Sequence, residues 1–156
     1  MKGQKSDRLR AAEPALYALL GALLGAAVGA VIVLFGRGVD FFTAFGAEHF
    51  SLYVWFLPVV GVLTAGMLRL WGRGPVGMAA AFRASRGEEK NYPLRNALFQ
   101  FAGTWGAHLF CASVGREGAG IQSGAAIGGN DGARIPLSGA DKILLGAGMA
   151  AGFSAL

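Results

Sequence analysis

The sequence has little charge and almost no cysteine. Only 15% of its 156 residues are charged, whereas 54% are hydrophobic, and Cys111 is the single cysteine. One cysteine excludes an internal disulfide framework, and so small a charged fraction is uncommon in soluble domains. Together with a mean hydropathy of +0.49, this composition indicates that the chain is a membrane protein.

Long uncharged runs follow from this composition. Residues 14–36, 50–68 and 96–115 carry no Asp, Glu, Lys or Arg, and each run can cross about 30 Å of hydrocarbon as a helix. A further apolar run begins at Ile143 and still continues at Leu156, so we expect the chain to be truncated there. The first run is too long for a signal peptide. The sequence therefore predicts an all-α, polytopic protein with tilted and broken helices, placed in the lipid bilayer of a cell membrane, the bacterial inner membrane.

The basic residues are segregated by loop, and the net charge is +5. They concentrate before the first run and between the second and the third, which predicts that the N-terminus and the second loop are cytoplasmic. Residues 37–49 should face the opposite side. Because the basic residues are not interleaved with aromatic ones, nucleic acid is not an expected partner. The residues concerned are Lys2, Lys5, Arg8 and Arg10, then Arg69, Arg73, Arg83, Arg86, Lys90 and Arg95.

Glycine and proline divide the remaining chain. Residues 72–93 mix Gly, Pro and charge, which predicts a short helix from about Met78 to Arg86 between two breaks. In the first run, Gly21, Gly25 and Gly29 recur at every fourth position. Such glycines share one helical face, where a neighbouring helix can approach closely.

The most informative segment is the glycine-rich stretch 115–128. Arg116 and Glu117 come directly after an apolar run, so we expect them within the depth of the membrane, where an acid is a functional candidate. The glycines allow a sharp turn, and the free N–H groups of a new short helix beginning near Gly118 would attract an anion. An ionised Glu117 would occupy the same place and leave it when protonated. Glu117 is therefore the expected gating and proton-transfer residue.

Other sites are less well supported by the residues. In a purely structural alternative, Glu117 pairs with Arg116 or Arg134. A phosphate-binding loop is excluded because the stretch lacks a Gly-Lys-Ser/Thr ending. His108 and Cys111 are too few for a metal site, and no cofactor is expected. Residues 152–155 are similar to the Gly-x-Ser-Gly of intramembrane serine proteases but lack the last glycine; that activity would need His108 beside Ser154. We expect that the protein is not an enzyme and has no catalytic residues.

The stretch Gly115-Arg116-Glu117-Gly118, with Gln122 and Gly124 after it, resembles the signature of the CLC family of chloride channels and proton-coupled anion transporters. Ala119 replaces the proline of that signature, and residues 146–153 resemble the Gly/Ala-rich helix that follows it. The resemblance implies a CLC-like fold in which 1–13 is a cytoplasmic segment and 14–156 is part of a transmembrane domain. A second, inverted half and a homodimer are implied for the full protein.

The resemblance also implies an anion-binding loop at residues 74–78, before the predicted short helix. The loop serine of the chloride-carrying branch would correspond to Val76 without a gap, or to Met78 after a contraction of two residues. Neither side chain is a hydrogen-bond donor. A replaced loop serine, with Met among the substitutes, resembles the fluoride/proton antiporter branch of the family and favours Met78 over Val76. The implied function is fluoride or chloride transport, by a channel or an anion/proton antiporter. A serine protease and a non-transporting scaffold subunit are the alternatives. The implied anion-binding residues are Val76, Gly77, Met78, Gly115, Arg116, Gly118, Ala119 and Gly120.

Overall fold

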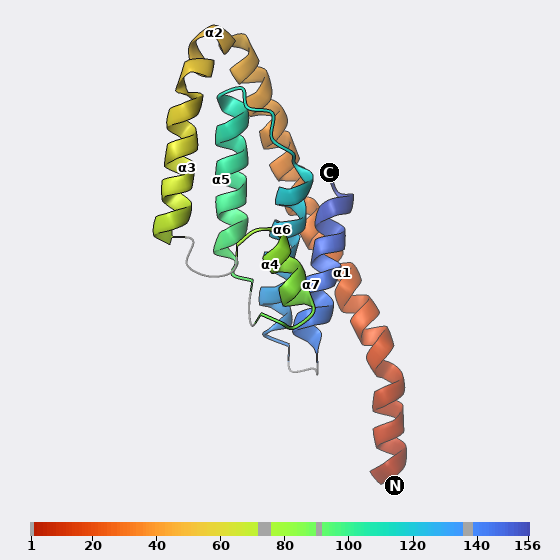
Figure 1. Cartoon of the computed structure of the whole chain (residues 1–156). Coiled ribbons are helices and arrows are strands. Elements are labelled where there is room, and N and C mark those ends of the chain that lie inside the picture. Colours follow the sequence, from red (N-terminus) through yellow and green to blue (C-terminus); the bar gives the residue numbers. More distant parts are fainter. Residues whose placement is uncertain (1, 72–75, 90–91, 136–138) are drawn as a thin grey trace.

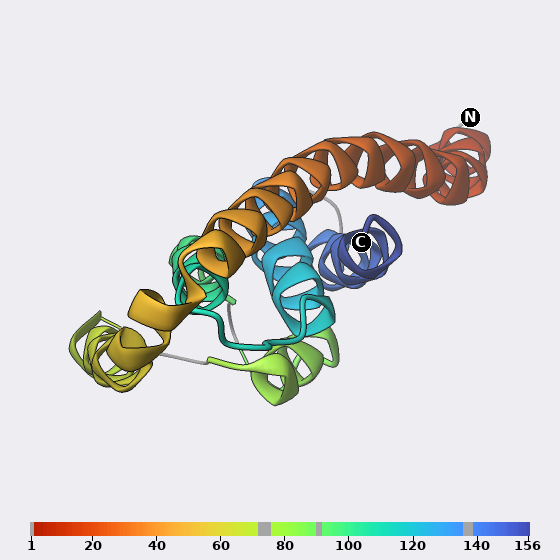
Figure 2. The ribbon, with the colours of Figure 1, turned by 90° about the horizontal axis from the view of Figure 1, so that it is seen from above.

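The computed structural model describes residues 2–71, 76–89, 92–135 and 139–156, with side chains from residue 14 onward except at 71 and 141. Within these ranges every element is helical, which confirms the all-α prediction. The elements are α1 (Lys2–Glu48), α2 (Phe50–Tyr53), the 3-10 helix η1 (Val54–Phe56), α3 (Leu57–Trp71), α4 (Met78–Ser85), α5 (Arg95–Leu109), α6 (Glu117–Gly132) and α7 (Ala140–Ser154). Helix α1 runs along the molecule, and α4 to α7 lie on one side of it (Figures 1 and 2).

Helix α1 is longer than the first uncharged run. The sequence predicted a loop over residues 37–49, but the helix continues to Glu48, so that prediction was wrong. Glycine at position 38 is used for packing there, because a Cβ atom on Gly38 would lie 2.6 Å from the Trp105 ring. The Trp105 indole N–H also donates to the Phe35 carbonyl over 3.0 Å. Contact between Gly38 and Trp105 of α5 therefore stabilises this part of α1. Because α1 also crosses residue 13 without a break, the domain boundary there stays a prediction.

One face of α1 forms much of the core. Leu24, Val28, Ile32, Phe35 and Val39 are all buried, and their spacing of three or four residues places them along one helical stripe. This stripe packs against α5 and α7, which are the main neighbours of α1. The other faces of α1 carry large exposed apolar side chains, as lipid contact would require.

The glycine face predicted for α1 forms only in part. A Cβ atom on Gly25 would lie 3.9 Å from Ala151, and one on Gly29 would lie 4.0 Å from Ala155, both on or next to α7. These are ordinary packing distances. Gly21 has no atom within 4 Å of such a Cβ position, so the expected close approach is absent at that residue.

Close backbone contact occurs instead between α6 and α7, which form the most extensive helix pair. A Cβ atom on Gly120 would lie 2.5 Å from the Gly152 carbonyl oxygen. One turn further on, Gly124 faces Gly148 in the same manner. Side chains larger than hydrogen cannot fit at these positions, so the two backbones touch directly.

In the described part of the chain, two segments are long and apolar enough to cross a membrane, namely residues 14–48 and 50–70. The second is wholly unburied in its most apolar window. The third expected crossing is shorter than predicted, since α5 has 15 residues and ends at Leu109. It is followed by Cys111 in a left-handed conformation with φ of 66°. The thiol of Cys111 donates to the Gly46 carbonyl over 3.3 Å, which ties this turn to α1.

Candidate functional site

The acidic residue predicted from the sequence begins helix α6. After α5 ends, residues 112–115 are neither helix nor strand and lead to Glu117, the first residue of α6. Figure 1 shows that α6 starts part-way along the molecule, below the end of α5. A helix of the length of α5 covers only about 22 Å, less than a bilayer core of about 30 Å. The expected broken helix is confirmed, and Glu117 follows an incomplete crossing.

The start of α6 offers backbone N–H groups. The first bond of its ladder runs from the Gly120 amide to the Arg116 carbonyl over 3.0 Å. The amides of Glu117, Gly118 and Ala119 precede this ladder and are the donors that a helix N-terminus leaves available. Gly120 differs, because its amide already donates within the helix and its Cα faces α7. Gly120 therefore serves helix packing, and its expected place among the anion-binding residues stays a prediction.

The carboxylate of Glu117 lies beside Gly115. Its Oε2 atom is 3.1 Å from the point where a Cβ atom on Gly115 would be, so a side chain at 115 would press on the carboxylate. Glu117 is exposed on the surface of this chain.

The arginines near Glu117 have other partners. Arg116 forms an ion pair with Asp40 on α1, with 3.1 Å between Nη1 and Oδ1. Arg134 lies 4.0 Å from Asp131, a neighbour on the same helix turn. Among the ion pairs of the described residues, none involves Glu117. The alternative in which Glu117 pairs with either arginine is therefore not supported.

A second helix starts next to the first. Helix α4 begins at Met78, close to the predicted residue, and its N-cap Gly77 has φ of 90° and ψ of 166°. That conformation is accessible essentially to glycine alone. The Ala81 amide donates to the Gly77 carbonyl over 3.2 Å, so the amides of residues 78–80 precede the ladder of α4.

The two helix starts meet at Met78 and Gly118. The Met78 Cε atom is 3.5 Å from the position that a Cβ atom on Gly118 would occupy. Val76, the other residue that could correspond to the loop serine, lies ahead of α4. Val76 and Met78 are equally exposed, at 38% of their surface. The structure thus brings Met78 to the residue that follows Glu117. Residues 74 and 75 of the same predicted loop lie outside the described ranges.

Sequence analysis missed a buried polar network behind these helix starts. Tyr92 donates its hydroxyl proton to Oε1 of Gln122 over 2.9 Å, and Gln100 donates to the same oxygen over 2.8 Å. The Gln122 amide in turn donates to the Gly118 carbonyl over 3.0 Å. Gln122 stood within the glycine-rich stretch, but the spacing of Tyr92 and Gln100 gave no signal that they would reach it.

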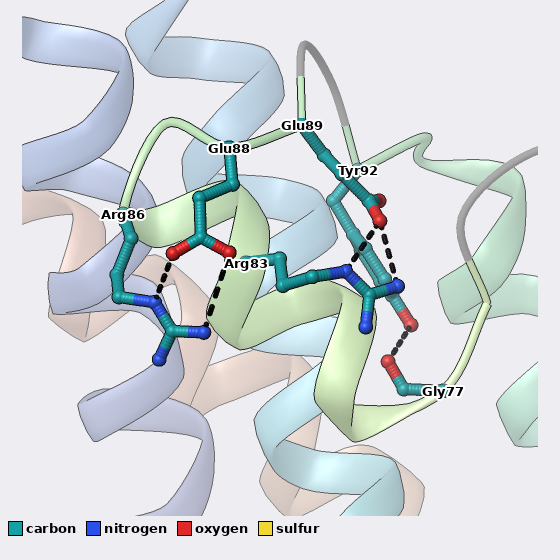
Figure 3. A network of polar contacts seen from close by, with 6 residues as sticks. All are labelled: Gly77, Arg83, Arg86, Glu88, Glu89 and Tyr92. Atoms are coloured by element: carbon teal, nitrogen blue, oxygen red, sulfur yellow. Dashed lines mark hydrogen bonds and ion pairs between the residues drawn. The ribbon is translucent and has the colours of Figure 1, made fainter.

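The far end of α4 carries two ion pairs, one partly buried and one exposed (Figure 3). Arg83 pairs with Glu89 over 2.6 Å and Arg86 with Glu88 over 2.7 Å. The hydrogen bond from Arg86 lowers the pKa of Glu88. The Arg86–Glu88 pair contributes little to stability because solvent screens it. These pairs orient the loop after α4 and lie outside the anion site.

The residues considered for a protease site and for a metal site do not come together in the structure. His108 Nδ1 is 3.2 Å from the Thr43 hydroxyl and its Nε2 is 3.2 Å from the Val114 carbonyl. Ser154 donates its hydroxyl to the Ala151 carbonyl of its own helix. Among the hydrogen bonds of the described residues, none joins the histidine to the serine, as a protease would require. In the described part of the chain, no group of three potential metal ligands occurs.

Comparison with known proteins decides the family. A family model described as "Voltage gated chloride channel" matches residues 60–156. The chain belongs to this family. It is 33% identical over 126 residues to a "Chloride/fluoride channel protein" of Pseudomonas syringae pv. tomato, covering 79% of this chain and 27% of that protein. It also matches the crystal structure of a CLC-type fluoride/proton antiporter with a TM-score of 0.85 and 39% identity.

These matches confirm the CLC-like fold and support the fluoride branch of the family. The solved antiporter is matched over 92% of this chain but over 37% of its own length. The chain thus spans about a third of the length of the relatives it matches. Membership of a family of channels and transporters confirms that the chain is not an enzyme, and it does not favour the protease or scaffold alternatives.

Proposed function

We propose that the chain forms part of a transmembrane path for fluoride or chloride, in which Glu117 is both the gate and the proton carrier. One observation carries this proposal, namely that the N-termini of α4 and α6 converge at Met78 and Gly118, beside Glu117. Both helix dipoles and their leading amides favour a negative charge at this point.

The mechanism is competition between the carboxylate and the anion. When Glu117 is ionised, its carboxylate can accept hydrogen bonds from the leading amides of α6 and close the path. When a proton is bound, the neutral side chain loses most of its attraction to those amides and the anion can replace it. Each exchange moves an anion and a proton in opposite directions, which is antiport.

Fluoride is the favoured substrate. Met78 is the side chain nearest to Gly118 among the described neighbours of that residue, and a thioether cannot donate a hydrogen bond to a dehydrated chloride ion. The named activities of the two relatives, a chloride/fluoride channel and a fluoride/proton antiporter, agree with this choice. The proposed anion-binding set is Gly77, Met78, Gly115, Arg116, Gly118 and Ala119.

Direct flux measurement tests the function. The full-length protein in liposomes should release fluoride faster than chloride, bromide or nitrate, with proton movement recorded in the same experiment. Fluoride release that drives proton uptake would establish antiport, and fluoride release without proton movement would establish a channel. Absence of flux for all of these anions would contradict the proposal.

We further propose a multi-pass arrangement with a cytoplasmic N-terminus and a homodimer in the membrane. Figure 1 supports the proposed topology, because the start of α1 and the end of α3 point towards one end of the molecule and α2 lies at the other. Of the basic residues concerned, Arg73, Lys90 and the side chains before residue 14 lie outside the described part of the chain.

Cysteine labelling tests this topology. In a Cys111→Ala background, Ser6→Cys should react only with reagent on the cytoplasmic side and Glu48→Cys only with reagent on the outside. Labelling of position 48 from the cytoplasm alone would contradict the arrangement.

A further inference from the structure

A buried hydrogen-bond network on Gln122 of α6 includes Tyr92, which packs against α4 beside the start of that helix. Tyr92 lies ahead of α5 with 2% of its surface exposed, and its hydroxyl oxygen is 2.9 Å from Gln122 Oε1 and 3.4 Å from the Gly77 carbonyl oxygen. Figure 3 shows the ring running beside α4 with the hydroxyl pointing at Gly77. Gly77 adjoins Met78, so Tyr92 reaches one side of the anion site.

Gln122 belongs to α6 and connects Tyr92 to the start of that helix. It is 7% exposed, and its Nε2 atom donates to the carbonyl of Gly118, the residue after Glu117. That carbonyl can only accept, which fixes the orientation of the amide. Oε1 then faces two donors, Tyr92 and Gln100. The Tyr92 hydroxyl has a single proton, which it donates to Gln122 over the shorter distance, so the Gly77 carbonyl at 3.4 Å is at most a weak second acceptor. A buried network of this kind is costly to break.

Where α4 and α6 contribute to the apolar cluster around this network, their buried side chains are small, while Leu145 and Met149 of α7 complete the cluster. Helix α4 contributes alanines 80, 81 and 84 to the cluster that includes Tyr92, and α6 contributes alanines 125 and 126. Methyl groups do not interdigitate as larger side chains do, so such a surface specifies the relative position of two helices weakly. The hydrogen bonds of Tyr92 and Gln122 fix the relative position of the two helices, which the small side chains specify only weakly.

We propose that Tyr92 and Gln122 are positioning residues that hold the N-termini of α4 and α6 at a fixed separation and thereby select the size of the anion. The inference rests on the proposed function, since it concerns the same site. Without the Tyr92 hydroxyl, Met78 and Gly118 can move apart, and the site accepts the larger chloride ion more readily while holding fluoride less tightly.

Tyr92→Phe is the decisive variant, because it removes the hydroxyl and keeps the buried ring. In liposomes of the full-length protein, the apparent KM for fluoride should rise about fivefold and the fluoride-to-chloride rate ratio should fall by a similar factor, as expected for one lost hydrogen bond. The maximal fluoride rate should change less than twofold. Tyr53→Phe, which removes a hydroxyl at the α2 end of the molecule, is the matched control and should change none of these values.

Coupling within the network gives a second readout. Gln122→Met alone and Gln122→Met combined with Tyr92→Phe should show the same selectivity, because both break the same connection. If Tyr92→Phe lowers the yield of folded protein, Gln100→Met replaces it, and a selectivity shift of about twofold in the same direction is expected, since one donor to Gln122 remains.

Unchanged KM and selectivity in folded Tyr92→Phe, or additive effects in the double variant, would overturn the positioning role. A lower melting temperature with normal selectivity would also overturn it, because it would show a purely structural contact. The proposed function fails separately, if Glu117→Gln retains proton coupling. Loss of coupling in that variant, together with normal selectivity in Tyr92→Phe, would therefore remove only the present inference.

Discussion

Helices α6 and α7 meet through glycine, whereas α3 presents large apolar side chains to its surroundings. Gly124 and Gly148 face each other backbone to backbone, while Val62 and Leu63 on α3 are 72% and 66% exposed. In a bilayer, lipid tails replace water as the solvent for such side chains, so α3 gains little from packing against protein. The position of α6, and with it the anion site, is instead set by contacts that one methyl group would disturb.

The largest expected effect breaks the glycine contact. Gly124→Ala places a methyl group against the Gly148 carbonyl, where only a backbone shift can accommodate it. We expect a loss of about 3 kcal/mol in the free energy of unfolding, towards the upper end of overpacking effects. Thermal unfolding of the full-length protein in detergent measures it.

Gly61→Ala on α3 is the matched control, because no atom lies within 4 Å of its Cβ position. Alanine is the better helix former, so this change should alter stability by less than about 1 kcal/mol. Equal destabilisation by the two substitutions would contradict the distinction between the two regions.

A smaller effect is expected at the anion site. Met78→Ser in the full-length protein should increase chloride passage relative to fluoride on the order of tenfold, because a hydroxyl can donate to the anion and offset part of its dehydration cost. Anion flux from liposomes with each ion separately measures the ratio. Met67→Ser on α3 changes the same side chain away from the site and should leave the ratio unaltered.

The outcome also decides between the two alignments of the anion loop. If Met78→Ser leaves the ratio unchanged and Val76→Ser changes it, the ungapped alignment is correct and Met78 is not the residue that faces the anion. A change of similar size in Met67→Ser would show that the measured effect is not specific to the site.

Local signals in the sequence were enough to predict both helix starts of the site. Gly77 and the break before it predicted α4 almost to the residue, because only glycine adopts its conformation readily. The glycines of the stretch 115–128 predicted a helix beginning near Gly118, one residue from the start of α6 at Glu117. In both places, the residues that determine where the helix starts lie within one short segment.

Predictions failed where distant segments interact. The end of α5 depends on Cys111, whose left-handed conformation is unusual for a residue other than glycine and is accompanied by a contact with Gly46 of α1. The continuation of α1 through Gly38 depends on the Trp105 ring. Tyr92 reaches Gln122 across 30 positions of sequence. No periodicity or motif in a single segment reports such contacts.

Simultaneous anion and proton flux through Glu117→Gln, in liposomes of the full-length protein at several pH values, tests the central claim most directly. Glutamine has nearly the same shape as glutamate but cannot ionise or release a proton, so the start of α6 should keep its fold. We expect proton coupling and the pH dependence of gating to disappear while anion flux persists. Coupling and pH dependence equal to those of the unmodified protein would contradict the assignment of Glu117 as gate and proton carrier.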